Sequence, residues 1–312
     1  QRRRDARGIF RRQPRQSWQQ WQCDNLAQLL AQFAPAQRKL PLDSLAANYP
    51  EAVADARLER AIARAWRRRK ARFLRKCFRS SSAFCARRDW RRAAVWKRDF
   101  DSDDLADFIQ NPDAWMARGA LLKDGHSATV VRARLGGRAV VIKRNNIRNP
   151  LHWLRHCLRT PRCRRNWRNA HLLHLCGLIT PAPIAAMEER WGPLRFRGYY
   201  LCAFDDSPSA AHKYATACPS AAERARFAEL FEGMRLARIC HGDFKASNLL
   251  VTERGIALLD LDSMKEAPTL ADMDEFARKD RRRFLKNWRD QPEQMEAFVG
   301  VFESGCGVNS VE

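Results

Sequence analysis

The sequence has no apolar run of the roughly 18 residues that a membrane-spanning helix needs, and no signal-peptide core follows its first arginines. Its ten cysteines are scattered, and none stands in the C-x-x-C spacing of a zinc site or a redox motif. Scattered cysteines of this kind are typical of reduced thiols in the cytosol. We therefore expect a cytoplasmic protein that lies on a membrane surface and does not cross it.

Acidic residues are scarce, and one long stretch has none. The chain carries 58 Lys and Arg against 35 Asp and Glu, a formal net charge of +23. From Arg144 through Met187 there is no Asp or Glu at all. Such an excess of positive charge indicates an anionic partner, and charge alone does not distinguish a phosphosugar or a membrane from nucleic acid. No segment resembles a nucleic-acid-binding module, so we expect no nucleic-acid partner.

One polar loop stands out against this background. The stretch ICHGDFKASNLLV, residues 239–251, places His, Gly, Asp, Lys and Asn between two apolar flanks. The flanks predict strand edges at Arg238–Cys240 and Asn248–Val251, so the polar residues lie on a tight loop. A surface turn that is capped by Asp243 would explain H-G-D alone. A loop with an acid, a base and an amide is nevertheless a place where chemistry is more plausible than packing.

The next stretch, GIALLDLDSM, favours chemistry. Its short apolar run ends at Asp260, so Asp243, Asn248 and Asp260 form a set of acid, amide and acid around one hairpin. Phosphoryl transfer needs a carboxylate that orients the attacking hydroxyl, and oxygen ligands that hold Mg²⁺ on the phosphates. Lys245 would neutralise charge on the transferred group. The spacing D-x-K-x-x-N, a hairpin, then D repeats the catalytic and metal loops of protein kinases.

The upstream half supplies a phosphate-covering hairpin and a strand lysine. The sequence LLKDGHSATVVRARLGGRAVVIKR predicts strands at Ala128–Leu135 and Arg138–Lys143, joined by a turn at Gly136–Gly137. The turn that precedes them, Asp124–Ser127, would contact the nucleotide through Gly125, His126 and Ser127. Lys143 ends the V-V-I-K strand, as the ATP-contacting lysine of kinases does. Alone, a lysine there is usually a solvated strand end, and the loop has one glycine only.

These motifs together resemble a known family. The segments VVIKR, RRNWRNAHLLHLCGLITPAP, GPLRFRGYYLCAF, HGDFKASNLL, LLDLDSM and RRRFLKNW look like the lipopolysaccharide core kinases, which are the bacterial heptose and Kdo kinases of the protein-kinase-like fold. The resemblance covers roughly Trp115 to Trp288. It implies ATP-dependent phosphorylation of a sugar hydroxyl in the inner core of lipopolysaccharide, at the cytoplasmic face of the inner membrane.

The resemblance also assigns roles and an architecture. Asp243 would be the catalytic base with Lys245 beside the transferred group, Asn248 and Asp260 would bind Mg²⁺, and Lys143 would contact the ATP phosphates. The expected class is α+β, a two-lobed protein-kinase-like fold with a small antiparallel sheet in the N-lobe and a mainly helical C-lobe. We expect a basic, mostly helical region over residues 1–100, the N-lobe over 101–204 and the C-lobe over 205–312, with FDDSPSA as linker.

The pattern departs from that of protein kinases in several places. In protein kinases a glutamate on the following helix pairs with the strand lysine, and in this sequence Asn166 occupies the position where we would expect it. Either Asp260 or another acid therefore orients Lys143, or the site is weakened. Asp262 replaces the glycine of D-F-G, and H-G-D replaces H-R-D, the form of small-molecule kinases. The stretch after Asp260 is short and has no A-P-E sequence. A protein substrate is therefore the less favoured reading, although a fold does not settle the substrate.

The region before the kinase-like part is rich in arginine. Leu58, Ile62, Trp66, Phe73 and Cys77 lie near one face of a helix predicted within Pro41–Ser80, and arginines and lysines surround that face. This is typical of a basic amphipathic helix on an anionic membrane surface, or of an ordinary packed helix with a solvated side. Residues Gln1–Arg38 predict a flexible or partly helical arm. Because the sequence begins without Met, we expect a fragment of a longer chain.

Two other hypotheses remain open from the sequence. One is a small-molecule or protein kinase with a soluble acceptor, which would use the same machinery. The other is a catalytically inactive kinase-like scaffold, which the missing helix glutamate and the poor glycine loop favour. The presence of Lys143, Asp243, Asn248 and Asp260 argues against a scaffold, because a scaffold has no need of all four.

Overall fold

The structure is a computed structural model that describes residues 3–4, 10–11, 18–48, 50, 56–147 and 149–304. The chain divides into two compact units, Gln1–Ala71 and Arg72–Glu312, and the division falls within helix α4 (Ala56–Lys76). Each unit is described separately below. No described helix combines the length and the apolar character needed to cross a bilayer.

The first unit is helical over most of its described residues. Its elements are β1 (Arg3–Arg4), β2 (Phe10–Arg11), α1 (Trp18–Leu30), η1 (Pro35–Arg38), α2 (Lys39–Asn48) and the first part of α4. Leu58 and Ile62 of α4 pack with Ala27 and Leu30 of α1 in a small apolar core. Arg69 donates hydrogen bonds to the carbonyl oxygens of residues 31 and 32, which satisfies acceptors at the end of α1.

Helix α4 has the amphipathic pattern that the sequence predicted, and its apolar side is covered by protein. Leu58, Ile62 and Trp66 are each at most 8% exposed. In the second unit, the backbone carbonyl of Cys77 accepts a hydrogen bond of 2.9 Å from Trp167, and Phe73 packs edge-on against Phe84. The apolar side of α4 therefore serves packing, which leaves only its charged side for contact with a membrane.

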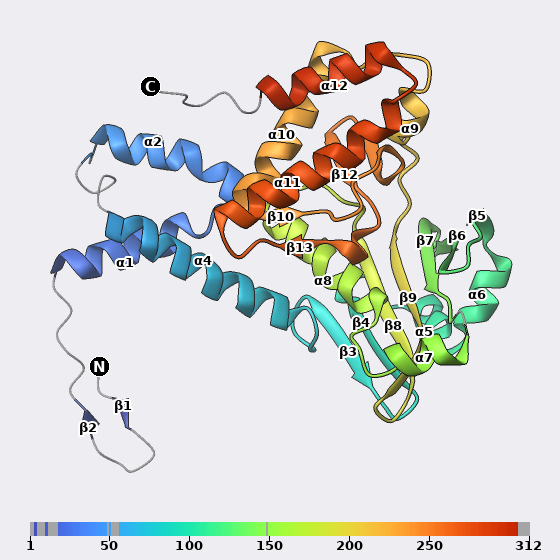
Figure 1. Ribbon diagram of the computed structural model, residues 1–312. Helices are drawn as coiled ribbons and strands as arrows, with labels where there is room; N and C mark the ends of the chain where they lie inside the picture. Colours follow the sequence, from blue (N-terminus) through green and yellow to red (C-terminus); the bar gives the residue numbers. More distant parts are fainter. Residues whose placement is uncertain are drawn as a thin grey trace. The chain divides into compact units, whose positions relative to one another are not determined.

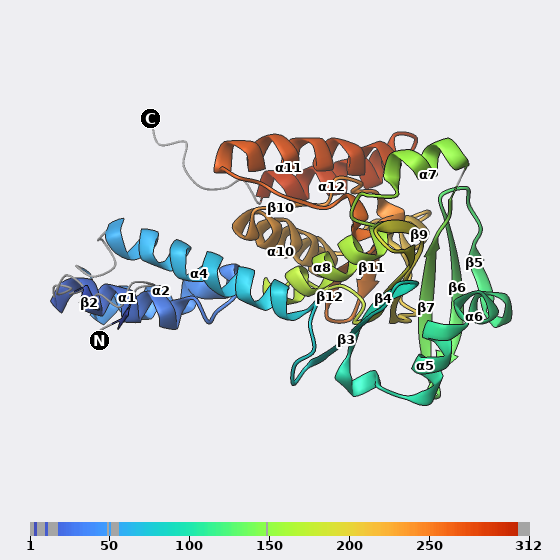
Figure 2. The same ribbon diagram turned by 90° about the horizontal axis from the view of Figure 1, so that it is seen from below.

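The second unit is built on a seven-stranded sheet in which every neighbouring pair is antiparallel (Figures 1 and 2). The order is β3-β4-β8-β9-β7-β6-β5. The strands are β3 (Phe84–Arg88), β4 (Arg92–Lys97), β5 (Ala120–Lys123), β6 (Ala128–Leu135), β7 (Arg138–Asn145), β8 (Pro183–Trp191) and β9 (Leu194–Ala203). The predicted strand Ala128–Leu135 matches β6, and the predicted strand ending at Lys143 is the main part of β7.

The turn between β6 and β7 explains why the sequence predicted these two strands. Gly136 and Gly137 have φ values of +55° and +76°, the left-handed conformation that a two-residue hairpin requires and that glycine adopts without strain. The flanking residues pair in one unbroken register from Leu135↔Arg138 to Ala128↔Asn145. Turn chemistry and strand pattern thus specify the same hairpin.

The sheet begins earlier in the chain than the sequence indicated. Strands β3 and β4 lie within residues 1–100, the region predicted to be mostly helical, so that description is wrong for residues 84–97. The signal that was missed is Asp89, whose side chain accepts hydrogen bonds from the backbone N–H groups of Arg91 and Arg92 and closes a hairpin. The lobe boundaries at residues 100 and 204 otherwise remain predictions.

Four helices pack near the sheet: α5 (Asp103–Gln110), α6 (Pro112–Arg118), α7 (Pro150–His156) and α8 (Arg162–Leu175). Helix α5 begins after a cap at residue 102, where the Ser102 hydroxyl accepts the N–H of Leu105. Leu105 and Phe108 join Val140 and Ile142 of β7 in one buried apolar cluster. This packing fixes the strand that carries Lys143.

The rest of the second unit is mainly helical, with α9 (Ala210–Lys213), α10 (Ala221–Ala237), α11 (Leu270–Leu285) and α12 (Pro292–Ser304). Two small two-stranded antiparallel sheets, β10 (Ile239–Cys240) with β13 (Lys265–Glu266) and the hairpin β11 (Leu249–Thr252) with β12 (Gly255–Leu258), lie among them. Short turns of helix are η2 (Arg98–Phe100), η3 (Ala246–Asn248), η4 (Leu261–Ser263) and η5 (Lys286–Trp288). The expected α+β class, an antiparallel sheet ahead of a helical part, is confirmed.

An aromatic core holds the helical part together. Phe227 and Phe231 of α10, Phe284 of α11 and Phe298 of α12 pack against one another, with ring centroids 4.9–6.4 Å apart. Phe244, next to Asp243, is fully buried in the same cluster and lies 5.7 Å from Phe284. The H-G-D-F loop is therefore anchored to the core by its phenylalanine.

Candidate active site

The H-G-D loop follows β10 and is fixed by a buried histidine. The His241 side chain is completely buried. Its Nδ1 accepts the backbone N–H of Asp243 at 3.3 Å, so Nε2 carries the ring proton and donates to the carbonyl oxygen of Leu259 at 2.7 Å. This one side chain therefore joins the catalytic loop to the strand end that leads to Asp260.

A carboxylate from α11 holds the same loop from the other side. Asp280 accepts the backbone N–H of His241 at 2.7 Å and that of Gly242 at 3.0 Å. Burial raises the pKa of the Asp280 carboxyl above its usual range, against the two N–H donors, which favour the charged form. Sequence reasoning missed Asp280. The available signal was an acid at a core-facing position of an amphipathic helix, where a buried charge requires a partner.

The glycine of H-G-D is required by both space and conformation. Gly242 has a φ of +77°, and a Cβ built on it would lie 2.6 Å from the backbone oxygen of Ser263. A larger residue at position 242 would therefore push the catalytic loop away from the metal-side loop. This accounts for H-G-D in this chain without reference to an activation loop.

The loop presents Asp243 among polar and cationic groups. Its Oδ2 lies 3.1 Å from Nζ of Lys245 and accepts a hydrogen bond of 3.3 Å from Asn248. Its Oδ1 forms an ion pair with Arg283 of α11, although no hydrogen bond of good geometry reaches that oxygen. The Asp243 side chain is 21% exposed, so an acceptor hydroxyl can reach it.

The β11–β12 hairpin brings Asn248 and Asp260 together. Leu249 pairs with Leu258, and the N–H of Leu259 donates to the carbonyl oxygen of Asn248 at 2.8 Å. Asn248 and Asp260 therefore lie together at the open end of this hairpin. Asp260 has a φ of +55° and turns the chain sharply as it leaves this end. Such left-handed conformations at non-glycine residues are costly and concentrate at functional sites.

Lys143 reaches this end from the sheet. Its Nζ lies 2.5 Å from Oδ1 of Asp260, and its side chain is 15% exposed. Burial alone would raise the pKa of Asp260, but the charge and hydrogen bond of Lys143 outweigh it and hold that pKa below its usual range. The sequence left open whether an acid such as Asp260 orients Lys143 or whether the site is weakened. The structure contains the contact between Lys143 and Asp260.

Two oxygens at this site fit Mg²⁺. Asn248 directs its Nδ2 to the carbonyl oxygen of Asp243 at 2.9 Å, which leaves its Oδ1 available, and Asp260 uses only Oδ1 for Lys143. Among the described residues, no group of three or more His, Cys, Asp or Glu is placed to hold a metal. An ion held by Asn248 and Asp260 would therefore take its other ligands from phosphate and water, as Mg²⁺ does in phosphoryl-transfer sites.

The turn predicted to contact nucleotide is ordered by Asn146, directly after β7. Asn146 donates from Nδ2 to the carbonyl oxygen of Gly125 at 3.0 Å, and its own N–H donates to Ser127 at 3.1 Å. His126 and Ser127 line two different hollows, of about 670 and 380 Å³, and neither hollow includes Asp243 or Asp260. The structure thus does not bring these turn residues into one cavity with the catalytic loop.

Helix α8 supports the loop after Asp260 without a glutamate. Asn166, the residue at the expected glutamate position, is buried, and its side-chain nitrogen has no hydrogen-bond partner among the described residues. Asn169 donates to the carbonyl oxygen of Leu261 at 2.8 Å, and Arg162 lies 3.5 Å from Asp262. Helix α8 therefore positions this loop through other residues, and Asp262 has a partner on that helix.

We expect Asp280→Ala to loosen the catalytic loop. Two backbone N–H groups would lose their acceptor, which costs on the order of 1–3 kcal/mol each in unfolding free energy when they stay buried. The matched control is Asp274→Ala, an exposed aspartate on the same helix. Chemical denaturation and hydrogen exchange at residues 241–243 measure both effects. Unchanged exchange at these amides in Asp280→Ala would contradict the assigned role.

We expect Lys143→Met to change the pH dependence of stability. The ionised Asp260 stabilises the native protein above its unfolded-state pKa of about 3.9, and this contribution is lost as pH falls through its lower native-state value. Without Lys143, burial raises the pKa of Asp260 and the buried carboxylate destabilises the protein near neutrality. Tm measured between about pH 3 and 7 should therefore differ most at neutral pH, whereas Lys123→Met, at an exposed lysine, should give a constant difference. A difference for Lys143→Met that is the same at every pH would contradict the pairing.

Comparisons with known proteins bear on this geometry. Residues 147–298 match the model of the lipopolysaccharide kinase (Kdo/WaaP) family. A solved structure described as WaaP in complex with acyl carrier protein is similar, with 17% sequence identity and a TM-score of 0.41, and the match covers 65% of this chain and 94% of that chain. A search of curated proteins gave no significant match. The family match supports a kinase of the lipopolysaccharide core in general and does not separate heptose from Kdo as acceptor. The resemblance expected from the sequence is thus confirmed over residues 147–298, the part of the chain that matches the model of the lipopolysaccharide kinase (Kdo/WaaP) family.

Proposed function

We propose that the protein is an ATP- and Mg²⁺-dependent kinase that phosphorylates a sugar hydroxyl, of heptose or Kdo, in the inner core of lipopolysaccharide. The observation that carries this proposal is a connected set of polar side chains at the ends of β7, the H-G-D loop and the β11–β12 hairpin. Lys143 contacts Asp260, the hairpin joins Asp260 to Asn248, and Asn248 contacts Asp243. A scaffold without activity would not need this arrangement.

In this proposal Asp243 accepts the proton of the attacking sugar hydroxyl. The hydroxyl oxygen forms a bond to the γ-phosphorus of ATP, the bond from that phosphorus to the β-γ bridging oxygen breaks, and ADP leaves. Lys245, 3.1 Å from Asp243, lies where it can balance charge on the transferred phosphoryl group. Charge balance and positioning account for most of the catalysis in such transfers.

The other two polar residues would hold the nucleotide. Bound Mg²⁺ supplies charge neutralisation on the phosphates, and Oδ1 of Asn248 and the carboxylate of Asp260 are the ligands we assign to it. Lys143 orients Asp260 and would contact the phosphates of ATP. The turn Gly125–Ser127 would cover them after closing toward the catalytic loop, with Asn146 as the anchor that limits its movement.

The proposal is tested by transfer of radiolabelled phosphate from ATP to core lipopolysaccharide stripped of its phosphate. We expect Asp243→Asn to lower kcat by about 10²- to 10⁴-fold, because it removes the proton acceptor but little packing. Nucleotide binding should remain. The control is Asp274→Asn, at an exposed position outside the site. Near-normal turnover in Asp243→Asn would show that the loop is misassigned, and acceptors that carry only heptose or only Kdo separate the two sugars.

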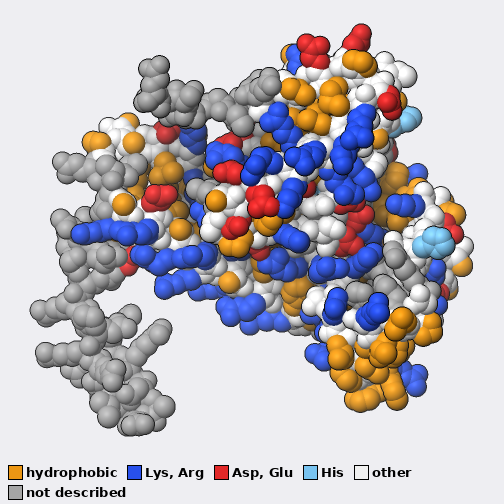
Figure 3. All heavy atoms as spheres, in the orientation of Figure 1, with side chains coloured by type: hydrophobic (Ala, Val, Ile, Leu, Met, Phe, Trp, Pro, Cys, Tyr) orange, Lys and Arg blue, Asp and Glu red, His pale blue; other side chains and the backbone are white. Residues whose placement is uncertain are grey.

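We further propose that the enzyme works on the cytoplasmic face of the inner membrane and docks there by charge. Exposed arginines follow one side of α4, where Figure 3 shows basic side chains, and these are Arg60, Arg64, Arg67, Arg68, Arg72 and Arg75. Because the apolar side of the helix is covered by protein, the attraction would be electrostatic and sensitive to salt.

Charge reversal tests this docking. The triple change Arg67→Glu, Arg68→Glu and Arg72→Glu should weaken binding to anionic vesicles, because each basic residue near such a surface contributes about 1 kcal/mol. Salt should have the same effect on the wild type. The control reverses three exposed arginines elsewhere, Arg254, Arg278 and Arg289, with the same change in net charge. Equal sedimentation of the wild type with anionic and neutral vesicles would contradict docking.

A further inference from the structure

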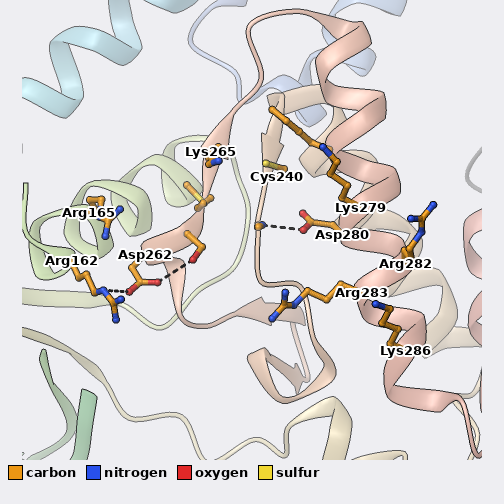
Figure 4. A pocket seen from close by; sticks show the side chains of 14 residues that line it. Arg162, Arg165, Cys240, Asp262, Lys265, Lys279, Asp280, Arg282, Arg283 and Lys286 are labelled. Carbon is orange, nitrogen blue, oxygen red and sulfur yellow. Dashed lines mark hydrogen bonds and ion pairs between the residues drawn. The ribbon is translucent and has the colours of Figure 1, made fainter. Parts of the chain in front are cut away.

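A hollow of about 760 Å³ opens beside the catalytic loop and is strongly basic (Figure 4). Gly242 of the H-G-D motif is part of its wall. Seven lysines and arginines line it against two aspartates: Arg162, Arg165, Lys265, Lys279, Arg282, Arg283 and Lys286 against Asp262 and Asp280. In Figure 4 the two arginines Arg162 and Arg165 come from α8. Lys279, Arg282 and Arg283 come from α11 and Lys286 from η5 directly after it, so the positive charge faces the hollow from two sides.

The carboxylates present do not neutralise this charge. Asp280 accepts hydrogen bonds from two backbone N–H groups of the catalytic loop, and Asp262 forms an ion pair with Arg162. Lys279 has its own partner on α11, Glu275.

Four cations of the wall have no carboxylate partner among the described residues, and these are Arg165, Lys265, Arg282 and Lys286. All four are exposed. Basic side chains also gather over α11 in the surface view (Figure 3). A concave surface with this much uncompensated positive charge concentrates anions.

Arg283 connects the hollow to the reacting carboxylate. Its guanidinium is part of the wall and forms the ion pair with Oδ1 of Asp243. No hydrogen bond of good geometry holds that oxygen, and the Arg283 side chain is 53% exposed. Because a guanidinium binds carboxylate or phosphate through two parallel hydrogen bonds, an anion in the hollow competes directly with Asp243 for Arg283.

We propose that this hollow is the acceptor subsite, that it binds a carboxylate or phosphate group which the sugar acceptor already carries, and that Arg283 leaves Asp243 to bind this group. The inference rests on the proposed kinase function and adds the chemical class of its acceptor. When Arg283 moves, Oδ1 of Asp243 becomes available for the proton of the hydroxyl. Arg283 is thus a positioning residue that makes the base available only when an anionic acceptor is bound.

This arrangement separates two classes of acceptor. An anionic sugar is attracted by Arg282 and Lys286, which favours its binding, and it draws Arg283 away from Asp243, which allows turnover. A neutral sugar gains neither, so Asp243 stays in its ion pair and transfer is slow. The two effects fall on different kinetic constants, since the first sets the KM for the acceptor and the second sets kcat.

The test compares three preparations of delipidated core oligosaccharide as acceptors for the wild-type protein. The first comes from cells without this kinase, so that its acceptor hydroxyl is free. The second is the first with its remaining phosphates removed, and the third is the first with its carboxylates reduced to alcohols. We expect kcat/KM to fall by at least about tenfold for the preparation that lacks the recognised group, since one charge-assisted contact is worth about that much. Which preparation loses activity identifies the group as phosphate or carboxylate.

Variants then assign the effect to this hollow. Arg282→Gln and Lys286→Gln should each raise the KM for the acceptor by about tenfold and leave the KM for ATP unchanged. Arg283→Gln should abolish the preference for the anionic acceptor, because the base is then available with either. The matched control is Arg278→Gln, at an exposed arginine of α11 that is not part of the wall.

Two results would overturn the inference, and they are distinguishable. If the wild type phosphorylates all three preparations with equal kcat/KM, the kinase function stands and the acceptor subsite is wrong. If the folded wild type transfers phosphate to none of them, the proposed function fails and the inference fails with it. The comparison of acceptors needs no variant, so a poorly folding mutant does not affect it.

Discussion

The hydrogen bonds from the catalytic loop to Asp280 are the constraint on which the rest of the site depends. The loop has one short strand before it and one turn of helix after it, so its own secondary structure does not fix its shape. Asp280 fixes two of its N–H groups, and the buried ring of His241 connects it to Leu259. Because Asp280 is on α11, the aromatic core that positions this helix also positions Asp243.

The second link runs between the sheet and the loops. In this chain the contact between Lys143 and Asp260 is made without an acidic residue on α8, which instead positions the following loop through Asn169 and Arg162. The long acid-free stretch that includes α8 is therefore compatible with an ordered site. It also leaves Arg165 of α8 without a carboxylate partner among the described residues, on the side where the basic hollow opens.

Local signals predicted the parts of the fold that local chemistry determines. Strand β6 and the Gly136–Gly137 turn both follow from neighbouring residues, and both were predicted. The roles of Asp280 and Arg283 depend on α11 packing against a loop some forty residues earlier, and the sequence pattern alone carries no such information. Strands β3 and β4 were missed because they are short and show no alternation of buried and exposed residues; the turn at Asp89 is their one local signal, and β4 is fixed in the sheet by its pairing with β8.

The central claim is that Asp260, oriented by Lys143, holds Mg²⁺ on a bound nucleotide. Calorimetric titration of ATP into the wild type and into Asp260→Asn, each with and without Mg²⁺, tests it most directly. The account predicts that Mg²⁺ tightens ATP binding to the wild type and has little effect on the variant, which keeps the shape of the side chain but loses its charge. Equal ATP affinity of the wild type with and without Mg²⁺, or an equal gain from Mg²⁺ in both proteins, would contradict the account.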